Sequence, residues 1–288
     1  MKHLLHSLSL LVMMALTATA TVKAQSAEPT TVNAQTDRPI RPVLSAWTIG
    51  IGSSHLADTY LTPLKYQGWS GSIAYERLQA TPWQPERWVM QLKLSADLCR
   101  TENPAGNALM WGAEVHASWG MMRRWNMAHG FSACIGPALR AEGGCLYNAR
   151  NGNNPASAKG AVTIDAIAFV ANSFSIGRLP VTVRYQPSLP VIGAFFSPQY
   201  DQLYYEMYLG NTSGLVHTAW WGTRFKLDNL VTVDLHLGST SLRLGYECNW
   251  MNSRANNITT RNITHRFVIG ATVNWTGIKK TKSAIQAL

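Results

Sequence analysis

Every second side chain of residues 88–98 is apolar, and from Gln91 onward the places between them are polar. The apolar positions begin with Trp88 and end with Leu98, and the places between them include Lys93 and Asp97. Since successive side chains of a strand point to opposite faces, this segment has one apolar face and one polar face. Such a segment is typical of a strand that crosses a membrane between lipid and a polar lumen.

The same alternation recurs along the chain, with turn-forming residues between the segments. We expect strands at residues 44–54, 68–78, 88–98, 109–119, 128–141, 161–171, 179–187, 200–209, 215–226, 230–237, 241–250 and 265–275. These segments predict an all-β fold, a single antiparallel transmembrane β-barrel of about twelve strands. A count of twelve fits the even strand number of bacterial single-chain barrels. A barrel of ten strands is the alternative, and residues 230–237 would then not span. Residues 238–240 are expected as a short periplasmic turn and residues 251–264 as a long outer loop.

The amino end has the pattern of a secretory signal peptide. A cationic start precedes an almost uncharged apolar run over residues 4–20, and small side chains follow. We expect cleavage between Ala24 and Gln25, and hence a location in the outer membrane. This gives a signal peptide at 1–24, a disordered periplasmic lead at 25–43, a barrel at 44–276 and a periplasmic tail at 277–288.

The formal net charge of +10 and the cysteine spacing limit the partners. In a cytoplasmic protein such a charge would favour nucleic acid, but an exported chain meets phosphate-bearing lipid instead. We therefore expect no nucleic acid, but outer-membrane lipid, lipopolysaccharide and, during insertion, the barrel assembly machinery. The four cysteines lack the paired spacing of a zinc site, so no metal or other cofactor is expected. A disulfide stays open, although we expect at least two free thiols.

Charged side chains on the polar strand faces are predicted to point into the lumen. They are Glu76, Lys93, Asp97, Glu114, Arg140, Asp165, Arg184, Arg224, Asp234, Arg243, Glu247 and Arg266. Because buried charges must be paired and the two signs nearly balance, we expect an ion-pair network that leaves little open pore. A second polar cluster is predicted at the outer rim, made of Tyr204, Tyr205, Glu206, His217 and His265.

Two short arrangements suggest a barrel hydrolase as a lesser hypothesis. His116 and Ser118 share one strand face, as a base and its nucleophile would, and this detail is similar to outer-membrane lipid A deacylases. Asp234 and His236 share another face, which resembles outer-membrane aspartyl-histidine proteases. Those proteases need a second acidic pair, and the chain has no Asp-x-Asp sequence. A lumen histidine packed beside a small serine explains the first arrangement more simply.

Three segments together resemble an uncharacterised family of exported Bacteroidetes proteins, known only as a domain of unknown function. They are residues 58–68, residues 196–200 with 204–206, and residues 242–246, and the likeness extends to His265 and residues 267–270. The resemblance covers most of the chain and implies an envelope location without an established activity. We expect an outer-membrane barrel with a structural, binding or narrow-transport role. The alternatives are a barrel hydrolase acting on lipid A or peptides and a soluble periplasmic β-sandwich.

Overall fold

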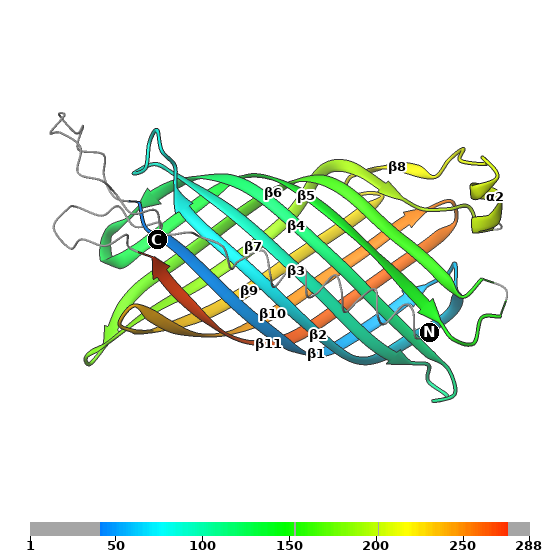
Figure 1. Cartoon of the computed structure of the whole chain (residues 1–288), viewed down its shortest axis with the longest axis horizontal. Helices are drawn as coiled ribbons and strands as arrows, with labels where there is room; N and C mark the ends of the chain where they lie inside the picture. Colours follow the sequence, from blue (N-terminus) through cyan, green and yellow to red (C-terminus); the bar gives the residue numbers. More distant parts are fainter. Residues whose placement is uncertain (1–40, 153, 201, 276–288) are drawn as a thin grey trace, which may run out of the picture. The chain divides into compact units, whose positions relative to one another are not determined.

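A computed structural model describes residues 41–152, 154–200 and 202–275. The expected signal peptide, the periplasmic tail and nearly all of the periplasmic lead lie outside these residues. The elements, drawn in Figure 1, are β1 (Val43–Asp58), β2 (Thr62–Ala80), β3 (Trp88–Glu102), β4 (Leu109–Asn126), η1 (Ala128–Gly130), β5 (Phe131–Asn148), β6 (Ala156–Ile176), β7 (Leu179–Phe196), α2 (Tyr204–Tyr208), β8 (Val216–Ala219), β9 (Arg224–Leu237), β10 (Thr240–Ala255) and β11 (Ile258–Trp275). No helix among the described residues is long and apolar enough to cross a bilayer.

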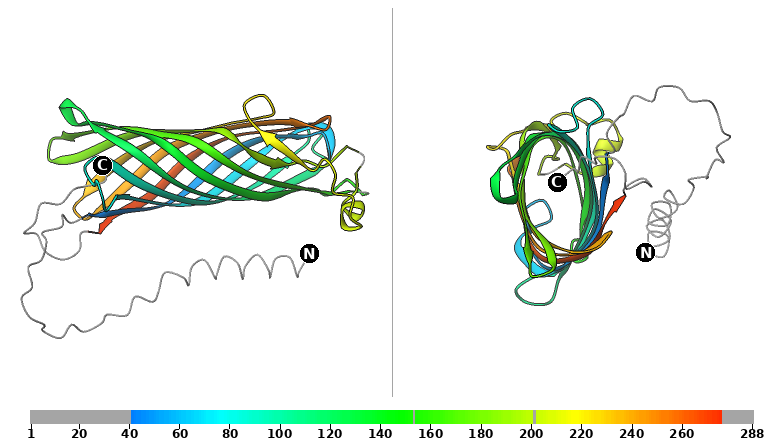
Figure 2. Two further views of the ribbon diagram at one scale, coloured as in Figure 1. Left: turned by 90° about the horizontal axis from the view of Figure 1, so that it is seen from above. Right: turned by 90° about the vertical axis from the view of Figure 1, so that its left-hand side faces the viewer.

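Ten of the strands form a closed antiparallel barrel. The strands β1 to β7 pair in chain order, β9 to β11 continue the ring, and β11 pairs with the whole length of β1. The short β8 pairs only with the last four residues of β7, so it is an extra strand beside the ring. Viewed along its axis, the barrel is oval, as the right-hand view of Figure 2 shows.

The ten-strand alternative is therefore correct, and the count of twelve is not. Residues 200–209 contain the helix α2, which Glu206 caps by accepting a hydrogen bond from the Leu203 N–H at 3.1 Å. Residues 215–226 are divided between β8, a turn and the start of β9. Residues 230–237 belong to the spanning strand β9, whereas the ten-strand alternative expected them not to span.

The strands also run further than the alternation predicts. Residues 251–264 are the end of β10, a two-residue turn and the start of β11, and not a long loop. Asn256 and Asn257 have φ of 50° and 60° in this turn, a left-handed conformation that asparagine tolerates. At the other end of β10, the expected short turn at residues 238–240 is present, with Gly238 at φ 91°.

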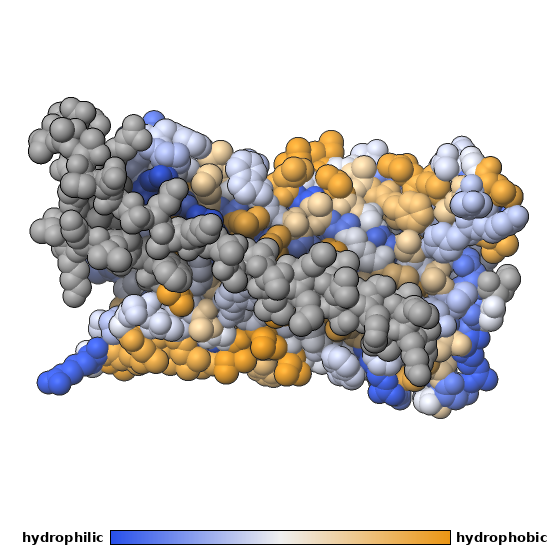
Figure 3. Space-filling view, in the orientation of Figure 1, coloured by the Kyte–Doolittle hydropathy of each residue, from blue (hydrophilic) through white to orange (hydrophobic). Residues whose placement is uncertain are grey.

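The barrel has two distinct ends. At the termini end, β1 begins and β11 finishes, and at the α2 end lies the longest connection, residues 197–223. Between the ends, the outward positions are largely apolar, and Figure 3 shows this hydrophobic surface between more hydrophilic ends. Ile49 lies between Ile73 and Ile269 in one such row across three strands. All three side chains are exposed, so the predicted outward direction of this alternation is confirmed.

Aromatic side chains border this apolar belt. Toward the α2 end the exposed aromatic residues include Trp69, Trp111, Tyr147 and Trp250, and toward the termini end they include Trp47, Trp125, Phe131 and Phe174. We define the apolar belt as the outward residues between these two sets. The strand that begins at Trp88 also turns its apolar side chains outward, because Leu94 and Leu98 are exposed while Gln91 is buried.

Among the described residues, the longest interruption in the hydrogen-bond ladder of the wall lies between β7 and β9. Pairing of β7 stops after Ser188 on the β9 side and resumes at Gly193 with β8. Within the described residues, residues 189–192 of β7 thus have no strand partner on this side. The indole of Trp221 lies here and donates its Nε1–H to the carbonyl oxygen of Pro190 at 2.5 Å.

The turn at Asn257 allows a test of the hairpin between β10 and β11. Asn257→Val should lower the free energy of unfolding by about 1–2 kcal/mol, because a β-branched residue is strained at positive φ. Asn257→Gly should change it by less than about 0.5 kcal/mol. Urea titration of the folded barrel measures both variants. An equal loss in the two would contradict a left-handed turn.

Candidate functional site

The inside of the barrel is filled by side chains in layers. An apolar cluster lies at the termini end and consists of Leu44, Leu78, Val89, Met122, Cys134, Ala138, Ile167 and Phe169. A second lies at the α2 end and consists of Leu56, Tyr60, Leu61, Tyr66, Cys99, Ala108, Met110, Leu146 and Ile258. Charged side chains occupy the space between, and we call them the lumen network.

Glu76 of β2 is the centre of the layer nearest the termini end. One carboxylate oxygen lies 2.5 Å from Arg184 Nη2 and 2.9 Å from Arg243 Nη1, and the other accepts from Gln91 Nε2 at 2.6 Å. Arg243 also holds Asp234 through two hydrogen bonds of 2.7 Å. Both arginine side chains are only 1% exposed. Because β2 and β7 are opposite in the ring of ten, the Glu76–Arg184 contact crosses the lumen.

The next layer is centred on Arg140 of β5. Its guanidinium contacts Asp165 of β6 at 2.7 Å and also contacts Asp228 of β9. It donates a further hydrogen bond to Ser188 Oγ at 2.8 Å. Asp165 is fully buried and accepts from Thr163 Oγ1 at 2.6 Å, so this layer ties β5, β6, β7 and β9 together.

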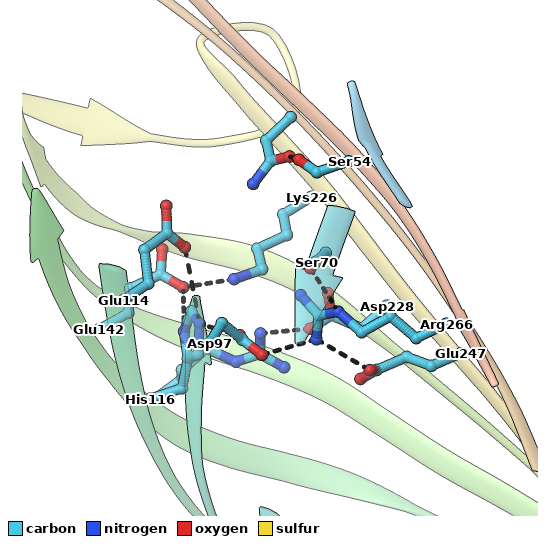
Figure 4. Close-up of polar contacts among 12 residues, drawn as sticks. Ser54, Ser70, Asp97, Glu114, His116, Glu142, Lys226, Asp228, Glu247 and Arg266 are labelled. Atoms are coloured by element: carbon cyan, nitrogen blue, oxygen red, sulfur yellow. Dashed lines mark hydrogen bonds and ion pairs between the residues drawn. The ribbon is translucent and has the colours of Figure 1, made fainter. Parts of the chain in front are cut away.

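Figure 4 shows the middle layer, in which His116 of β4 lies among three carboxylates. Its Nε2 is 2.9 Å from Asp97 Oδ2 and 3.6 Å from Glu114 Oε2, and its Nδ1 is 3.3 Å from Glu142 Oε2. Lys226 of β9 reaches the same Glu142 oxygen at 2.6 Å. Both imidazole nitrogens therefore have a carboxylate neighbour.

Two arginines complete this middle layer. Arg224 contacts Glu142 from β9. Arg266 of β11 contacts Asp97 at 2.6 Å and Glu247 at 3.1 Å, and its Nε donates to Ser70 Oγ at 2.9 Å (Figure 4). These contacts link β3, β10 and β11, so the layer extends across much of the barrel.

A final ion pair crosses the lumen near the α2 end. Lys159 Nζ of β6 lies 2.5 Å from Asp58 Oδ2 of β1, and these strands are opposite in the ring. Asp58 also accepts from Ser157 Oγ at 3.3 Å and is fully buried. The lumen is thus crossed directly at two levels, by the Glu76–Arg184 and Asp58–Lys159 pairs.

Three small hollows lie among these layers. The two that border His116 have cavity volumes of about 40 Å³ each, and one beside Arg224 and Phe195 has about 20 Å³. Volumes of this size hold a few water molecules. They are too small for a saccharide, a peptide or an acyl chain.

The structure places the residues predicted for the lumen as follows. Of those predicted, all but Lys93 have an ion pair among the described residues, and Lys93 lines one of the hollows. The sequence reasoning missed Asp58, Glu142, Lys159, Lys226 and Asp228. Lys226 and Asp228 fall where the alternation was divided into two strands. If the alternation had been continued through β9, Lys226 and Asp228 would have been assigned to the lumen face, together with Arg224 and Asp234.

The two arrangements considered for catalysis are not brought together. His116 binds carboxylates, and within the described residues it has no hydrogen bond to Ser118. Asp234 is held by Arg243, whereas His236 contacts Thr182 Oγ1 at 2.8 Å and Ser241 Oγ at 2.7 Å. His116 is thus not in contact with Ser118, and Asp234 is not in contact with His236.

The predicted outer-rim cluster is only partly assembled. Tyr204 packs on Tyr60, and its hydroxyl accepts a hydrogen bond from the Ala158 N–H at 2.6 Å. Burial raises the pKa of Tyr204 to about 12. In contrast, His265 lies on the outer wall, where its Nδ1 is 2.7 Å from the Tyr246 hydroxyl.

The remaining rim residues differ in their surroundings. Tyr205 is largely exposed, and Glu206 is used as the helix cap. His217 Nε2 is 3.3 Å from the Ser197 carbonyl oxygen and 3.1 Å from Asn256 Nδ2. Separately, all four cysteines are free thiols.

Several solved structures are similar to this chain at low sequence identity. The outer membrane protease OmpT from Escherichia coli matches with 8% identity and a TM-score of 0.44, covering 83% of this chain and 98% of that chain. The translocator domain of the autotransporter NalP from Neisseria meningitidis matches with 8% identity and a TM-score of 0.37, covering 84% and 90%. Neisserial surface protein A matches with 9% identity and a TM-score of 0.33, covering 81% and 97%.

No curated protein matches this chain in sequence. A family profile does match, over residues 7–282, and it is described as protein of unknown function (DUF3316). Since the match covers nearly the whole sequence, the chain belongs to the DUF3316 family.

Proposed function

We propose that this protein is an outer-membrane β-barrel with a closed lumen and a structural and binding role. The observation that carries the proposal is the filling of the lumen between opposite walls. Arg184 of β7 meets Glu76 of β2, and Lys159 of β6 meets Asp58 of β1. Apolar clusters at both ends lie above and below the lumen network. A solute larger than water would have to break buried ion pairs to pass.

The outer surface supports a location in a membrane. A belt of exposed isoleucine, leucine and valine side chains bordered by aromatic residues is the surface that lipid requires. Both ends of the barrel sequence lie at the termini end, and the longest connection lies at the α2 end. Since outer-membrane barrels keep short turns in the periplasm, the proposal orients the α2 end outward.

The proposal includes the steps that bring the chain to this membrane. They are cleavage of the signal peptide near Ala24, handling by the barrel assembly machinery and residence among outer-membrane lipid and lipopolysaccharide. A Gram-negative source, of the Bacteroidetes kind that the sequence motifs resemble, belongs to the same proposal. No hydrolytic reaction is included, because neither candidate arrangement has its members in contact.

Membrane location is tested by placing a charge in the apolar belt. Ile49→Arg should lower the free energy of unfolding in lipid vesicles by about 2–4 kcal/mol, since arginine is costly at the bilayer midplane. Gln67→Arg, on the same outer wall but nearer the α2 end, should cost only about 0–1 kcal/mol. Urea unfolding followed by tryptophan fluorescence measures both. Equal effects would argue against a lipid-facing belt.

The closed lumen is tested by conductance. The wild-type protein, inserted in planar bilayers, should give no stepwise current, because the ion pairs and apolar clusters fill its lumen. Heat-modifiable gel mobility of the same preparation verifies that the barrel is folded. Regular single-channel openings from a folded preparation would contradict the closed lumen and favour a transport role.

The network is tested through its central carboxylate. Glu76→Gln leaves Arg184 and Arg243 without full compensation and should lower the free energy of unfolding by about 3–5 kcal/mol. Glu247→Gln is the matched control, because Arg266 keeps its contact to Asp97. Urea unfolding should show a clearly smaller loss for the control. A larger loss for Glu247→Gln would place the centre of the network elsewhere.

A further inference from the structure

Three exposed cations gather on the outer wall near the α2 end. Lys65 of β2 and Arg261 of β11 are both paired with Ala57 of β1, so they flank one strand at the same height. Arg254 of β10 lies diagonally beside Arg261, because Arg261 pairs with Asn252. All three side chains are exposed. Among the described residues, none of the three is ion-paired with a carboxylate.

The position of these cations relative to the apolar belt is fixed by the strands that carry them. Arg254 is four residues beyond Trp250, and Lys65 is four residues beyond Trp69 on the same strand faces. At about 3.3 Å per residue and a tilt near 45°, each cation lies roughly 9 Å beyond the tryptophan ring along the barrel axis. Since tryptophan lies at the headgroup boundary, the cations are at the level of lipid phosphates.

Neighbouring positions add polar groups to this cluster of cations, and other parts of the outer wall differ from it. One row nearer the belt, His55 and Gln67 are paired with each other and exposed, so they offer further hydrogen-bonding groups. Arg100 of β3 is instead paired with Glu102 at 3.1 Å. On the far side of the barrel, Tyr147 and Val216 are exposed near this end, and the exposed Arg150 lies in the turn after β5. Lys65, Arg254 and Arg261 thus lie together on one arc of the outer wall.

The width of this arc indicates what it binds. From Arg254 on β10 to Lys65 on β2 there are three strand spacings, or about 14 Å. Two phosphates fixed on one saccharide headgroup match this width, because each cation can then contact a phosphate without converging on a single point. The exposed Phe267 and Ile51 lie below the arc and offer an apolar surface for acyl chains.

We propose that Lys65, Arg254 and Arg261 form a binding site for the phosphates of an outer-leaflet saccharolipid of the lipid A type. The acyl chains of the lipid lie against the apolar belt, and His55 and Gln67 contact the headgroup between the phosphates and the chains. This site rests on the proposed function, since it requires the α2 end to face outward.

The test compares lipid binding by the folded full-length barrel in detergent, measured by native mass spectrometry. The probe is bis-phosphorylated lipid A, and the variant is K65Q/R254Q/R261Q. With about 1 kcal/mol for each cation near a lipid surface, the variant should bind roughly 100-fold more weakly. The matched control, R77Q/R123Q, removes two exposed cations of the outer wall at the termini end and should bind like the wild type.

Further arms separate the sources of the effect. Monophosphorylated lipid A should bind the wild type more weakly, and phosphatidylglycerol should bind more weakly still. Unchanged binding by the triple variant, or an equal loss in the control, would overturn the site. Equal affinity for phosphatidylglycerol would overturn its assignment to a saccharolipid.

Folding and orientation are checked apart from the site. Heat-modifiable mobility reports whether the triple variant folds, and if it does not, the single variant R261Q and the salt dependence of wild-type binding decide. Raising salt from about 50 mM to about 500 mM should weaken wild-type binding, because exposed ionic contacts are screened. Binding that is insensitive both to salt and to R261Q would overturn the proposal. If the triple variant folds, gives no current and still binds lipid A like the wild type, the lipid site is overturned while the proposed closed barrel stands.

Discussion

The rest of this structure depends on pairing charge inside a narrow ring of strands. A guanidinium or carboxylate buried without a partner costs several kcal/mol, so each inward charge needs an opposite one within reach. In a ring of ten strands the opposite walls are close enough for side chains to meet, as Glu76 and Arg184 do. The oval section, seen in Figure 2, is in keeping with such contacts. A wider ring would leave the same residues around water.

The positive and negative charges of the lumen network do not balance. The layers around Glu76, Arg140 and His116 contain the cations Lys93, Arg140, Arg184, Arg224, Lys226, Arg243 and Arg266. Their carboxylates are Glu76, Asp97, Glu114, Glu142, Asp165, Asp228, Asp234 and Glu247. The carboxylates exceed the cations by one. Three of these carboxylates, Asp97, Glu114 and Glu142, surround His116.

The alternation of side chains predicts the faces of the strands well, because the strand itself has a period of two residues. It therefore identifies the belt at Ile49 and Ile73 and the lumen side of Arg184 and Arg243. It cannot predict which inward residues meet, since a contact such as Lys159 with Asp58 depends on ring size and stagger. Strand ends were also missed where polar residues continue a ladder, as at the turn of Asn256 and Asn257.

The same limit explains the catalytic hypotheses. Side chains two residues apart on a strand share a face, but their Cα atoms are roughly 6.6 Å apart. Direct partners on neighbouring strands are nearer, so His116 meets Glu142, its partner on β5, before it meets Ser118. Likewise, Asp234 finds Arg243 on the adjoining strand and not His236. A shared face is a condition for catalysis and not evidence of it.

The interruption between β7 and β9 has a consequence for the dynamics of the wall. Elsewhere neighbouring strands are joined by a nearly continuous ladder, but at residues 189–192 the β9 side has the hydrogen bond of Trp221 to Pro190 in its place. Local opening starts where the fewest backbone hydrogen bonds must break. Amide exchange and partial unzipping of this barrel should therefore begin at the β7–β9 seam and not where β1 meets β11.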